Sequence, residues 1–260
     1  MEENARLIRE LRQTLESVAQ PLEVIPEIHP DDFIFDFLVH NPVFESVEAA
    51  VGYYFTDGAS SAKKLRALLS DVCKLGNVPF SLLEFASGFG CVSRHLVNAI
   101  PSCELTASDI HPEAIRFLRN VLGVDAIPST ASPEDFPAEK TFNVVFALSF
   151  FSHMPKPTFT RWIRTLVHLL NDQGFLLFTT HGFASRKYFP HCEFDADGFF
   201  FDPSSEQKDL SPTEYGTSVV TPGYVFSQIF TFPDCHILYF HEGFWWEHQD
   251  LYILRKGDPI

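Results

Sequence analysis

The stretch LLEFASGFG, residues 82–90, limits the folds open to this chain more than any other segment. An apolar run leads into Glu84, and small residues then occupy every second position, namely Ala86, Gly88 and Gly90. Small residues after a strand let the backbone turn tightly and let a ligand approach it closely. In open α/β sheets such a turn lies at the carboxyl end of a strand, where nucleotides bind. We therefore expect an α/β fold with a nucleotide site at this turn.

Strand-like and helix-like patterns alternate along the rest of the chain, which indicates βαβ units and a parallel sheet. The expected strands are 81–86, 103–109, 125–129, 142–149 and 174–181, and the expected helices between them are 91–100, 111–123 and 156–171. Residues 236–243 and 251–256 resemble two further strands, and the short linker between them predicts an antiparallel closing hairpin.

Helical patterns dominate the part of the chain before the first strand. The helices expected there are 3–18, 31–40, 44–55 and 60–74, the last beginning at Ser60 and Ser61. We therefore divide the chain into an N-terminal helical cap or lid, residues 1–75, and a core, residues 76–260.

Residues 182–233 interrupt the alternation of strands and helices. They are rich in Phe, Asp, Pro and Ser, and only 221–230 has a helical pattern. A segment of this length inside a compact domain is usually a functional lid or insertion. We expect it to bind substrate, between the fifth and sixth strands. A Phe-rich core is the alternative explanation for the 28 Phe residues of the chain.

Charge and cysteine content narrow the class of partner and the compartment. The formal net charge is −15, and an acidic surface repels both nucleic acid and acidic lipid. Five cysteines without a CxxC pair fit reduced thiols in the cytoplasm better than a disulfide framework. The charged start MEENARLIRELRQ does not resemble a signal peptide, and no apolar run is long enough to cross a membrane. We expect a cytoplasmic protein that binds neither nucleic acid nor membrane.

Two features of the glycine-rich turn disfavour a dinucleotide as its ligand. The NAD fingerprint requires a third small residue, Gly or Ala, where this chain has Ser93. Glu84 would also lie close to the negative charge of the pyrophosphate. A carboxylate at this place suits a ligand that has a cationic or donor-rich part.

The stretch resembles the first motif of class I S-adenosylmethionine-dependent methyltransferases, an acidic residue followed by Gly-x-Gly-x-Gly, with Ala86 in place of the first glycine. Asp109 ends the next expected strand, about 20 residues past the last glycine, where an acidic residue accepts hydrogen bonds from ribose hydroxyls. A helix N-cap is the alternative role for Asp109. The resemblance covers roughly residues 50–256 and is strongest to small-molecule methyltransferases of bacteria.

The resemblance implies a Rossmann-like, seven-stranded sheet in the order 3-2-1-4-5-7-6, with the last strand antiparallel. It also implies methyl transfer from S-adenosylmethionine to oxygen or nitrogen of a small molecule, with S-adenosylhomocysteine as product. The cofactor would contact Tyr54, Glu84, Ala86, Gly88, Gly90, Asp109, Ile110, Ala131, Ser132, Ala147 and Ser149. The helix N-terminus expected at Ser60 and Ser61 is a second candidate for the cofactor carboxylate. Packing within the cap is the alternative for Tyr54.

Methyl transfer is an in-line displacement, in which the protein positions the nucleophile and in some cases takes a proton. Histidine is the natural base at neutral pH, and His153 and His181 follow the fourth and fifth expected strands. Each could instead orient its loop. The aromatic residues expected to line the acceptor pocket, or alternatively to pack the insertion, are Tyr215, Tyr224, Trp245 and Trp246.

No metal site is expected. Asp195-Ala-Asp197-Gly198 lacks the spacing of a calcium loop, and His191-Cys192 with His181 lacks zinc spacing. Two other functions stay open, an NAD(P)-dependent oxidoreductase and a non-catalytic partner subunit that binds S-adenosylmethionine. The amphipathic helix 3–18 could form a homodimer interface or cover the cofactor.

Overall fold

The computed structural model describes residues 2–76, 78–137, 139–205, 207 and 209–257. Contacts divide the chain into two compact units. The first unit is Met1–Pro79 with Ser87–Pro128, and the second is Phe80–Ala86 with Ser129–Ile260. The expected helical cap therefore shares a unit with part of the expected core. The chain crosses from the second unit to the first within the glycine-rich turn, after Ala86.

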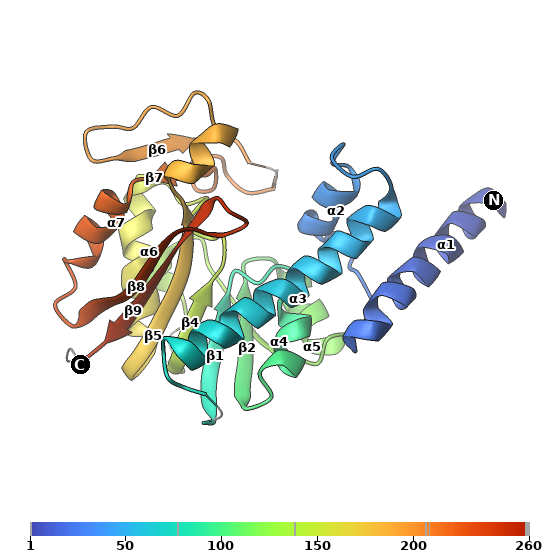
Figure 1. The fold of residues 1–260 in the computed structure, drawn as a ribbon, viewed down its shortest axis with the longest axis horizontal. Coiled ribbons are helices and arrows are strands. Elements are labelled where there is room, and N and C mark those ends of the chain that lie inside the picture. The colour runs from blue at the N-terminus through green and yellow to red at the C-terminus, as the bar shows by residue number, and fades with distance from the viewer. Residues whose placement is uncertain (1, 77, 138, 206, 208, 258–260) are drawn as a thin grey trace. The chain divides into compact units, whose positions relative to one another are not determined.

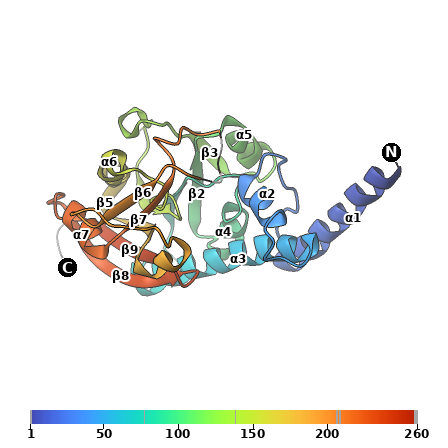
Figure 2. The same ribbon diagram turned by 90° about the horizontal axis from the view of Figure 1, so that it is seen from above.

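The described residues of the first unit form five α-helices, one 3-10 helix and two strands. In chain order they are α1 (Glu2–Ala19), the 3-10 helix η1 (Gln20–Leu22), α2 (Phe33–Val39), α3 (Val47–Asp71), α4 (Ser93–Ala99), β2 (Cys103–Asp109), α5 (Pro112–Asn120) and β3 (Asp125–Pro128). The long helix α3 packs against α1, α2 and α4 (Figures 1 and 2). Its buried face includes Ala50, Val51, Tyr54 and Phe55, which form one apolar cluster with Leu38 of α2. No helix among the described residues is long and apolar enough to cross a membrane.

The prediction of two helices at 44–55 and 60–74 is wrong, because α3 is continuous over 25 residues. It begins at Ser46, whose side chain accepts a hydrogen bond from the Ala49 N–H. Ser60 and Ser61 lie inside the helix, so no helix N-terminus exists there to receive a carboxylate. Gly58 lets α3 pack closely against the segment that leads into α4, since a Cβ at Gly58 would overlap the Cys91 carbonyl oxygen.

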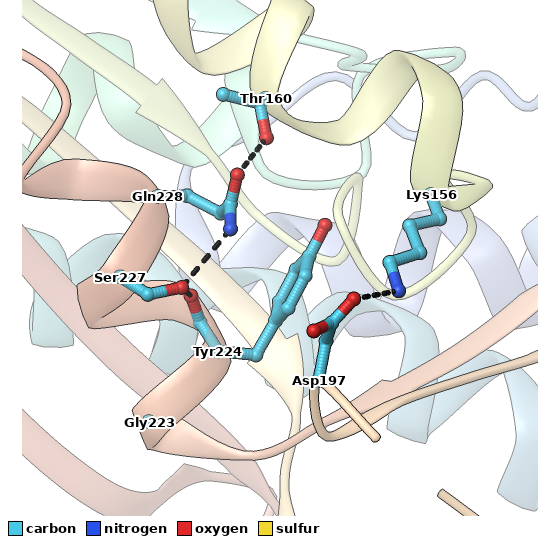
Figure 3. Close-up of a pocket in the computed structure, with 7 residues that line it drawn as sticks. All are labelled: Lys156, Thr160, Asp197, Gly223, Tyr224, Ser227 and Gln228. Carbon is cyan, nitrogen blue, oxygen red and sulfur yellow. Dashed lines mark hydrogen bonds and ion pairs between the residues drawn. The ribbon is translucent and has the colours of Figure 1, made fainter. Parts of the chain in front are cut away.

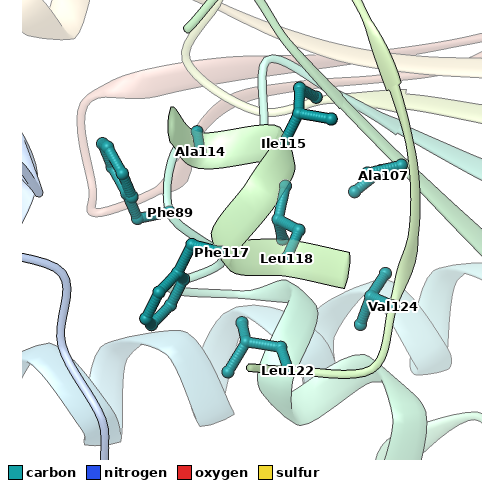
Figure 4. Close-up of a cluster of buried hydrophobic side chains, with 9 residues drawn as sticks. Phe89, Ala107, Ala114, Ile115, Phe117, Leu118, Leu122 and Val124 are labelled. Carbon is teal, nitrogen blue, oxygen red and sulfur yellow. The ribbon is translucent and has the colours of Figure 1, made fainter. Parts of the chain in front are cut away.

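The first unit has a second core, which is a cluster of apolar side chains beside the parallel strands β2 and β3. Figure 4 shows α5 contributing four of these side chains, Ala114, Ile115, Phe117 and Leu118. The other members are Phe89, Ala107, Leu122, Val124 and Ala126. Phe89 of the glycine-rich turn thus belongs to this core.

The second unit contains β1 (Phe80–Phe85), η2 (Pro133–Asp135), β4 (Phe142–Ala147), α6 (Lys156–His168), β5 (Leu170–His181), η3 (Phe183–Tyr188), β6 (Phe199–Asp202), β7 (Thr217–Val220), α7 (Pro222–Ile229), β8 (Cys235–Trp245) and β9 (Gln249–Lys256). The strands β1, β4 and β5 pair in parallel. β9 runs antiparallel to β5 along its length, and β8 runs antiparallel to β9, as Figure 1 shows.

The strand order in the sheet is β3-β2-β1-β4-β5-β7-β6, with β9 also paired to β5 and β8 to β9. The predicted order of the first five strands and the antiparallel closing hairpin are confirmed, with β8 and β9 as the predicted sixth and seventh strands. The predicted count of seven is wrong, because the described residues form nine strands. The additional hairpin, β6 with β7, lies in the insertion. Its strands have four residues each and no tight turn between them, so they gave no hairpin signal.

Candidate functional site

Three residues of the glycine-rich turn have left-handed backbone conformations. The φ angles are 57° at Ala86, 55° at Gly88 and 78° at Gly90. This conformation is free of strain for glycine but costs roughly 1–2 kcal/mol for alanine. A Cβ at Gly90 would lie 2.5 Å from Cδ1 of Leu122 and 3.0 Å from Cδ2 of Leu118. A Cβ at Gly88 would meet no heavy atom of the described residues within 4 Å, apart from its own chain neighbours. Gly90 therefore permits packing against α5, and Gly88 leaves open space where a ligand could approach.

Asp109 ends β2 and is almost fully buried. Its Oδ2 accepts the Gly88 N–H at 2.8 Å, and its Oδ1 accepts both the His111 N–H at 3.0 Å and His111 Nδ1 at 2.8 Å. The N-cap of α5 is His111 and not Asp109, which argues against the alternative role for Asp109. A carboxylate accepts about four hydrogen bonds, so these three leave room for about one ligand donor. Ile110, the other predicted contact here, is half-buried in the turn after β2.

A segment before α2 covers the glycine-rich turn, and the sequence analysis missed it. The ring of His29 stacks on Phe89 with centroids 4.6 Å apart. Arg94 of α4 fastens this segment, since Nη1 donates to the carbonyl oxygens of Ile25 at 2.8 Å and Glu27 at 3.0 Å. Its Nε donates to the Gly90 carbonyl oxygen at 3.1 Å. Ile25 and Glu27 lie more than 60 residues before Arg94, so no local pattern connects this segment to the turn.

Tyr54 is fully buried in α3, and its hydroxyl donates to Oδ2 of Asp32 at 2.6 Å. Burial raises the pKa of Tyr54 well above 10 and also raises the pKa of Asp32. The hydroxyl proton is thus committed to a protein acceptor. This geometry favours the packing role of Tyr54 over a contact with a cofactor carboxylate.

The predicted cofactor residues of the second unit lie near the carboxyl ends of β1 and β4. Glu84 is buried in β1 in register with Phe146 of β4, and Ala147 ends β4 with no exposed surface. Ser149 follows in a left-handed conformation with a φ of 59°. Ala131 and Ser132 lie on the turn that leads into η2, where Ala131 is exposed.

A hydrogen-bonded network joins Ser149 to the carboxyl end of β5. The Ser149 N–H donates to Thr179 Oγ1 at 2.8 Å, and that hydroxyl contacts Oε1 of Gln249 at 2.7 Å. Nε2 of Gln249 lies 2.8 Å from Ser149 Oγ and 3.4 Å from Nε2 of His181. The network therefore connects a predicted cofactor contact with a predicted base through a residue that the sequence analysis did not select.

The two predicted catalytic histidines lie near each other, with ring centroids 6.4 Å apart. His153 is half-buried, stacks on Tyr215 at 4.5 Å, and places Nδ1 2.8 Å from the Gly216 carbonyl oxygen. His181 is buried, and burial together with the nearby His153 and His248 lowers its pKa to about 3. His181 is therefore uncharged at neutral pH.

The four aromatic residues predicted to line an acceptor pocket do not gather at one place. Tyr215 stacks on His153, and Trp246 stacks on His248, whose ring lies 5.6 Å from that of His181. Trp245 has no exposed surface and packs against Phe146, so the structure supports its alternative role in the core.

Tyr224 lies in a different part of the second unit, in a pocket of about 520 Å³ shown in Figure 3. This pocket is lined by Lys156, Thr160, Asp197, Gly223, Tyr224, Ser227 and Gln228. Lys156 forms ion pairs with Asp195 and Asp197 across its rim. Among the described residues no three His, Cys, Asp or Glu side chains are arranged to hold a metal ion.

Comparison with known proteins finds similarity to methyltransferases in the part of the chain that holds the glycine-rich turn, Asp109, Ser149 and His153. Residues 83–176 match the family model of a methyltransferase domain. Over these residues, about a third of the chain, the protein is similar to methyltransferases. It is also 31% identical over 142 residues to the malonyl-acyl-carrier-protein O-methyltransferase of Methylococcus capsulatus. That match covers 53% of this chain, and the chain spans about half the length of this curated relative, 50%.

Solved structures of methyltransferases share the fold. The plantazolicin methyltransferase BpumL, in complex with S-adenosylhomocysteine, is 13% identical, with a TM-score of 0.56 over 99% of both chains. The 1,6-didemethyltoxoflavin N1-methyltransferase of Burkholderia thailandensis, which has the same product bound, is also 13% identical. Its TM-score is 0.53 over 77% of this chain and 79% of that one. The Rossmann-like class I methyltransferase fold predicted from the sequence is thus confirmed.

Proposed function

We propose that this methyltransferase transfers a methyl group from S-adenosylmethionine to oxygen or nitrogen of a small molecule and releases S-adenosylhomocysteine. The glycine-rich turn carries the proposal: the Gly88 N–H is held by the Asp109 carboxylate, and the space beside Gly88 is open. Asp109 retains capacity for a ribose hydroxyl. The methyltransferases BpumL and that of Burkholderia thailandensis were crystallised with S-adenosylhomocysteine, which supports the choice of cofactor.

The predicted contacts divide by the part of the cofactor that they would hold. The turn with Ala86, Gly88 and Gly90, Asp109 with Ile110, and the turn with Ala131 and Ser132 would bind the adenosine part. Glu84, Ala147 and Ser149 would bind the part that carries the ammonium group. When bound, S-adenosylmethionine supplies an electrophilic methyl group on a sulfonium. The protein then has to orient the acceptor and accept its proton where one is lost.

We assign the base role to His153 in preference to His181. The Gly216 carbonyl can only accept a hydrogen bond, so the neutral ring of His153 carries its proton on Nδ1 and its lone pair on Nε2. His181 is more deeply buried, and its Nε2 lies against Gln249. Tyr215, which stacks on His153, would contact the acceptor, and Trp246, which stacks on His248, would be a second aromatic contact.

Calorimetric titration with S-adenosylhomocysteine, NADH and NADPH tests the cofactor. We expect micromolar binding of S-adenosylhomocysteine and none of the nicotinamide nucleotides. The reverse result would support the oxidoreductase alternative. If S-adenosylhomocysteine binds, acceptors are screened with a labelled methyl donor. Binding without transfer to any acceptor would support a non-catalytic partner subunit.

We further propose that the protein acts in the cytoplasm and forms a homodimer through α1. Leu11 of this helix is partly exposed and lies on the apolar face predicted from the sequence. The acidic net charge of −15 supports a small-molecule acceptor over nucleic acid. Sedimentation equilibrium of the full chain and of a Leu11→Glu variant tests the dimer, which the variant should weaken.

A further inference from the structure

Gln249, the first residue of β9, is 2% exposed and touches three polar residues of the proposed site. We propose that Gln249 is a positioning residue: its amide holds His181 in the neutral tautomer with the proton on Nδ1, and it orients the Ser149 hydroxyl. The proton assignment stands on hydrogen-bond geometry alone. Only the consequence for Ser149 and its ligand rests on the proposed function.

The contact between His181 and Ser218 of β7 determines which ring nitrogen of His181 carries the proton. Nδ1 of His181 lies 3.2 Å from the carbonyl oxygen of Ser218, which can only accept. Nδ1 therefore carries the proton of the neutral ring, and Nε2 carries the lone pair. A lone pair needs a donor, so the NH₂ group of Gln249 faces His181 Nε2 at 3.4 Å.

The opposite end of the network leads to the same orientation of the amide. Thr179 Oγ1 accepts a hydrogen bond from the Ser149 N–H. The Thr179 hydroxyl then donates its own proton to Gln249 Oε1 at 2.7 Å. The amide oxygen thus faces Thr179. Its NH₂ group then faces Ser149 Oγ at 2.8 Å as well as His181.

The Ser149 hydroxyl is oriented by this contact. Its oxygen accepts from Gln249, so its proton points to Ser152 Oγ at 2.9 Å, and the Ser152 hydroxyl donates to the Ser149 carbonyl oxygen. A residue 100 positions away in the chain therefore sets the side chain of a predicted cofactor contact. The same amide also occupies the lone pair that His181 would need as a base.

A positive charge on His181 would be opposed from several elements. His153 approaches from the loop after β4 with ring centroids 6.4 Å apart, and His248 from the turn before β9 at 5.6 Å. Phe189, after η3, contributes only an apolar ring at 5.1 Å. Protonation of His181 would also place its Nε2–H against the NH₂ group of Gln249, so that two donors would face each other. Gln249 and its surroundings therefore favour the uncharged ring.

Nitrogen-resolved NMR of the full chain, titrated from about pH 4 to pH 8, reads the tautomer and titration of His181 directly. In the native protein we expect an Nδ1-protonated ring that stays neutral throughout. Gln249→Glu replaces the donor by a carboxylate that accepts from Nε2–H, so the pKa of His181 should rise by about 1–3 units. Gln249→Met keeps the size of the side chain without its hydrogen bonds, and should weaken S-adenosylhomocysteine binding about tenfold.

Tyr252→Phe is the matched control, since Tyr252 is buried in the same strand and its hydroxyl contacts Thr180 and not Ser149, Thr179, His181 or Gln249. It should leave the His181 spectrum and the affinity unchanged. An Nε2-protonated His181 in the native protein would overturn the inference even if the variants failed to fold. Native affinity for S-adenosylhomocysteine in a folded Gln249→Met would also overturn it. If the native protein binds no S-adenosylhomocysteine, the proposed function fails, while the tautomer of His181 still decides the role of Gln249.

Discussion

The contact between Gly88 and Asp109 in the first unit joins residues that are close in sequence, whereas the network around Gln249 in the second unit joins residues that are far apart. Gly88 and Asp109 are 21 residues apart, at the ends of successive strands. Ser149 and Gln249 are 100 residues apart, and the network also needs β5 and β7. A short motif thus builds the proposed cofactor turn, whereas the proposed acceptor side depends on strands that the whole sheet brings together.

The strongest test of the turn is Gly88→Val, which we expect to abolish S-adenosylhomocysteine binding in calorimetry. The added side chain would fill the open space beside Gly88 and strain its left-handed backbone. Gly123→Val is the matched control, because Gly123 has a φ of 67° and equally open surroundings outside the turn. Equal affinity in both variants would remove Gly88 from the site.

The network side is tested by His153→Ala and His181→Ala. With His153 as base, its removal should lower turnover by about 10²–10⁴-fold while affinity for S-adenosylhomocysteine is kept. His181→Ala should lower turnover less. Single-turnover rates with a labelled methyl donor distinguish them, and full activity of His153→Ala would make His153 a structural residue.

Asp250, the neighbour of Gln249 in the second unit, should make the stability of the protein depend on pH. Asp250 has no exposed surface, and burial raises its pKa to about 6 from an ordinary value of 3.8. The folded protein therefore holds this proton more tightly than the unfolded chain, and Asp250 lowers stability as the pH rises from 4 to 6, by about 3 kcal/mol in total.

Because asparagine cannot ionise, the Asp250→Asn variant should not lose stability in this way as the pH rises. Urea unfolding at pH 4 and pH 7 measures it: the variant should gain stability relative to the native protein at the higher pH only. An equal difference at both pH values would mean that Asp250 is not the group responsible.

Asp109→Ala tests whether the carboxylate next to the glycine-rich turn contributes to cofactor binding. Loss of a charge-assisted hydrogen bond to the ribose should weaken S-adenosylhomocysteine binding by about 1.5–3 kcal/mol. Because Asp109 also accepts from Gly88 and His111, thermal unfolding accompanies the titration. Unchanged affinity in the folded variant would exclude Asp109 from the cofactor site.

The smallest expected effect is that of Ala86→Gly. Ala86 has a left-handed φ of 57°, so glycine should relieve strain. The greater flexibility of glycine in the unfolded chain offsets part of the gain, which leaves a stabilisation of about 1 kcal/mol or less. Chemical denaturation measures it, and a destabilised variant would show that the Ala86 methyl group packs favourably.

Sequence reasoning predicted the elements with strong local signals. The run before Glu84, the small residues after it and the acidic end of β2 carry their own pattern, and the first five strands and the closing hairpin were found by it. The signals failed where tertiary packing prevails. The turn-like residues around Gly58 lie inside one continuous helix, and the four-residue strands β6 and β7 have no pattern of their own.

The sequence alone established the α/β class, the alternation of strands and helices along the chain and the position of the glycine-rich turn, because periodicity and glycine content act over a few residues. The order of the strands in the sheet was implied by the resemblance to a known family. Only the tertiary structure decided that Tyr54 donates to Asp32, that Trp245 belongs to the core, and that Gln249 joins Ser149 to His181. The physical reason is that hydrogen bonds and burial depend on which distant segments meet. Nothing in the local sequence of Gln249 specifies the strands that surround it.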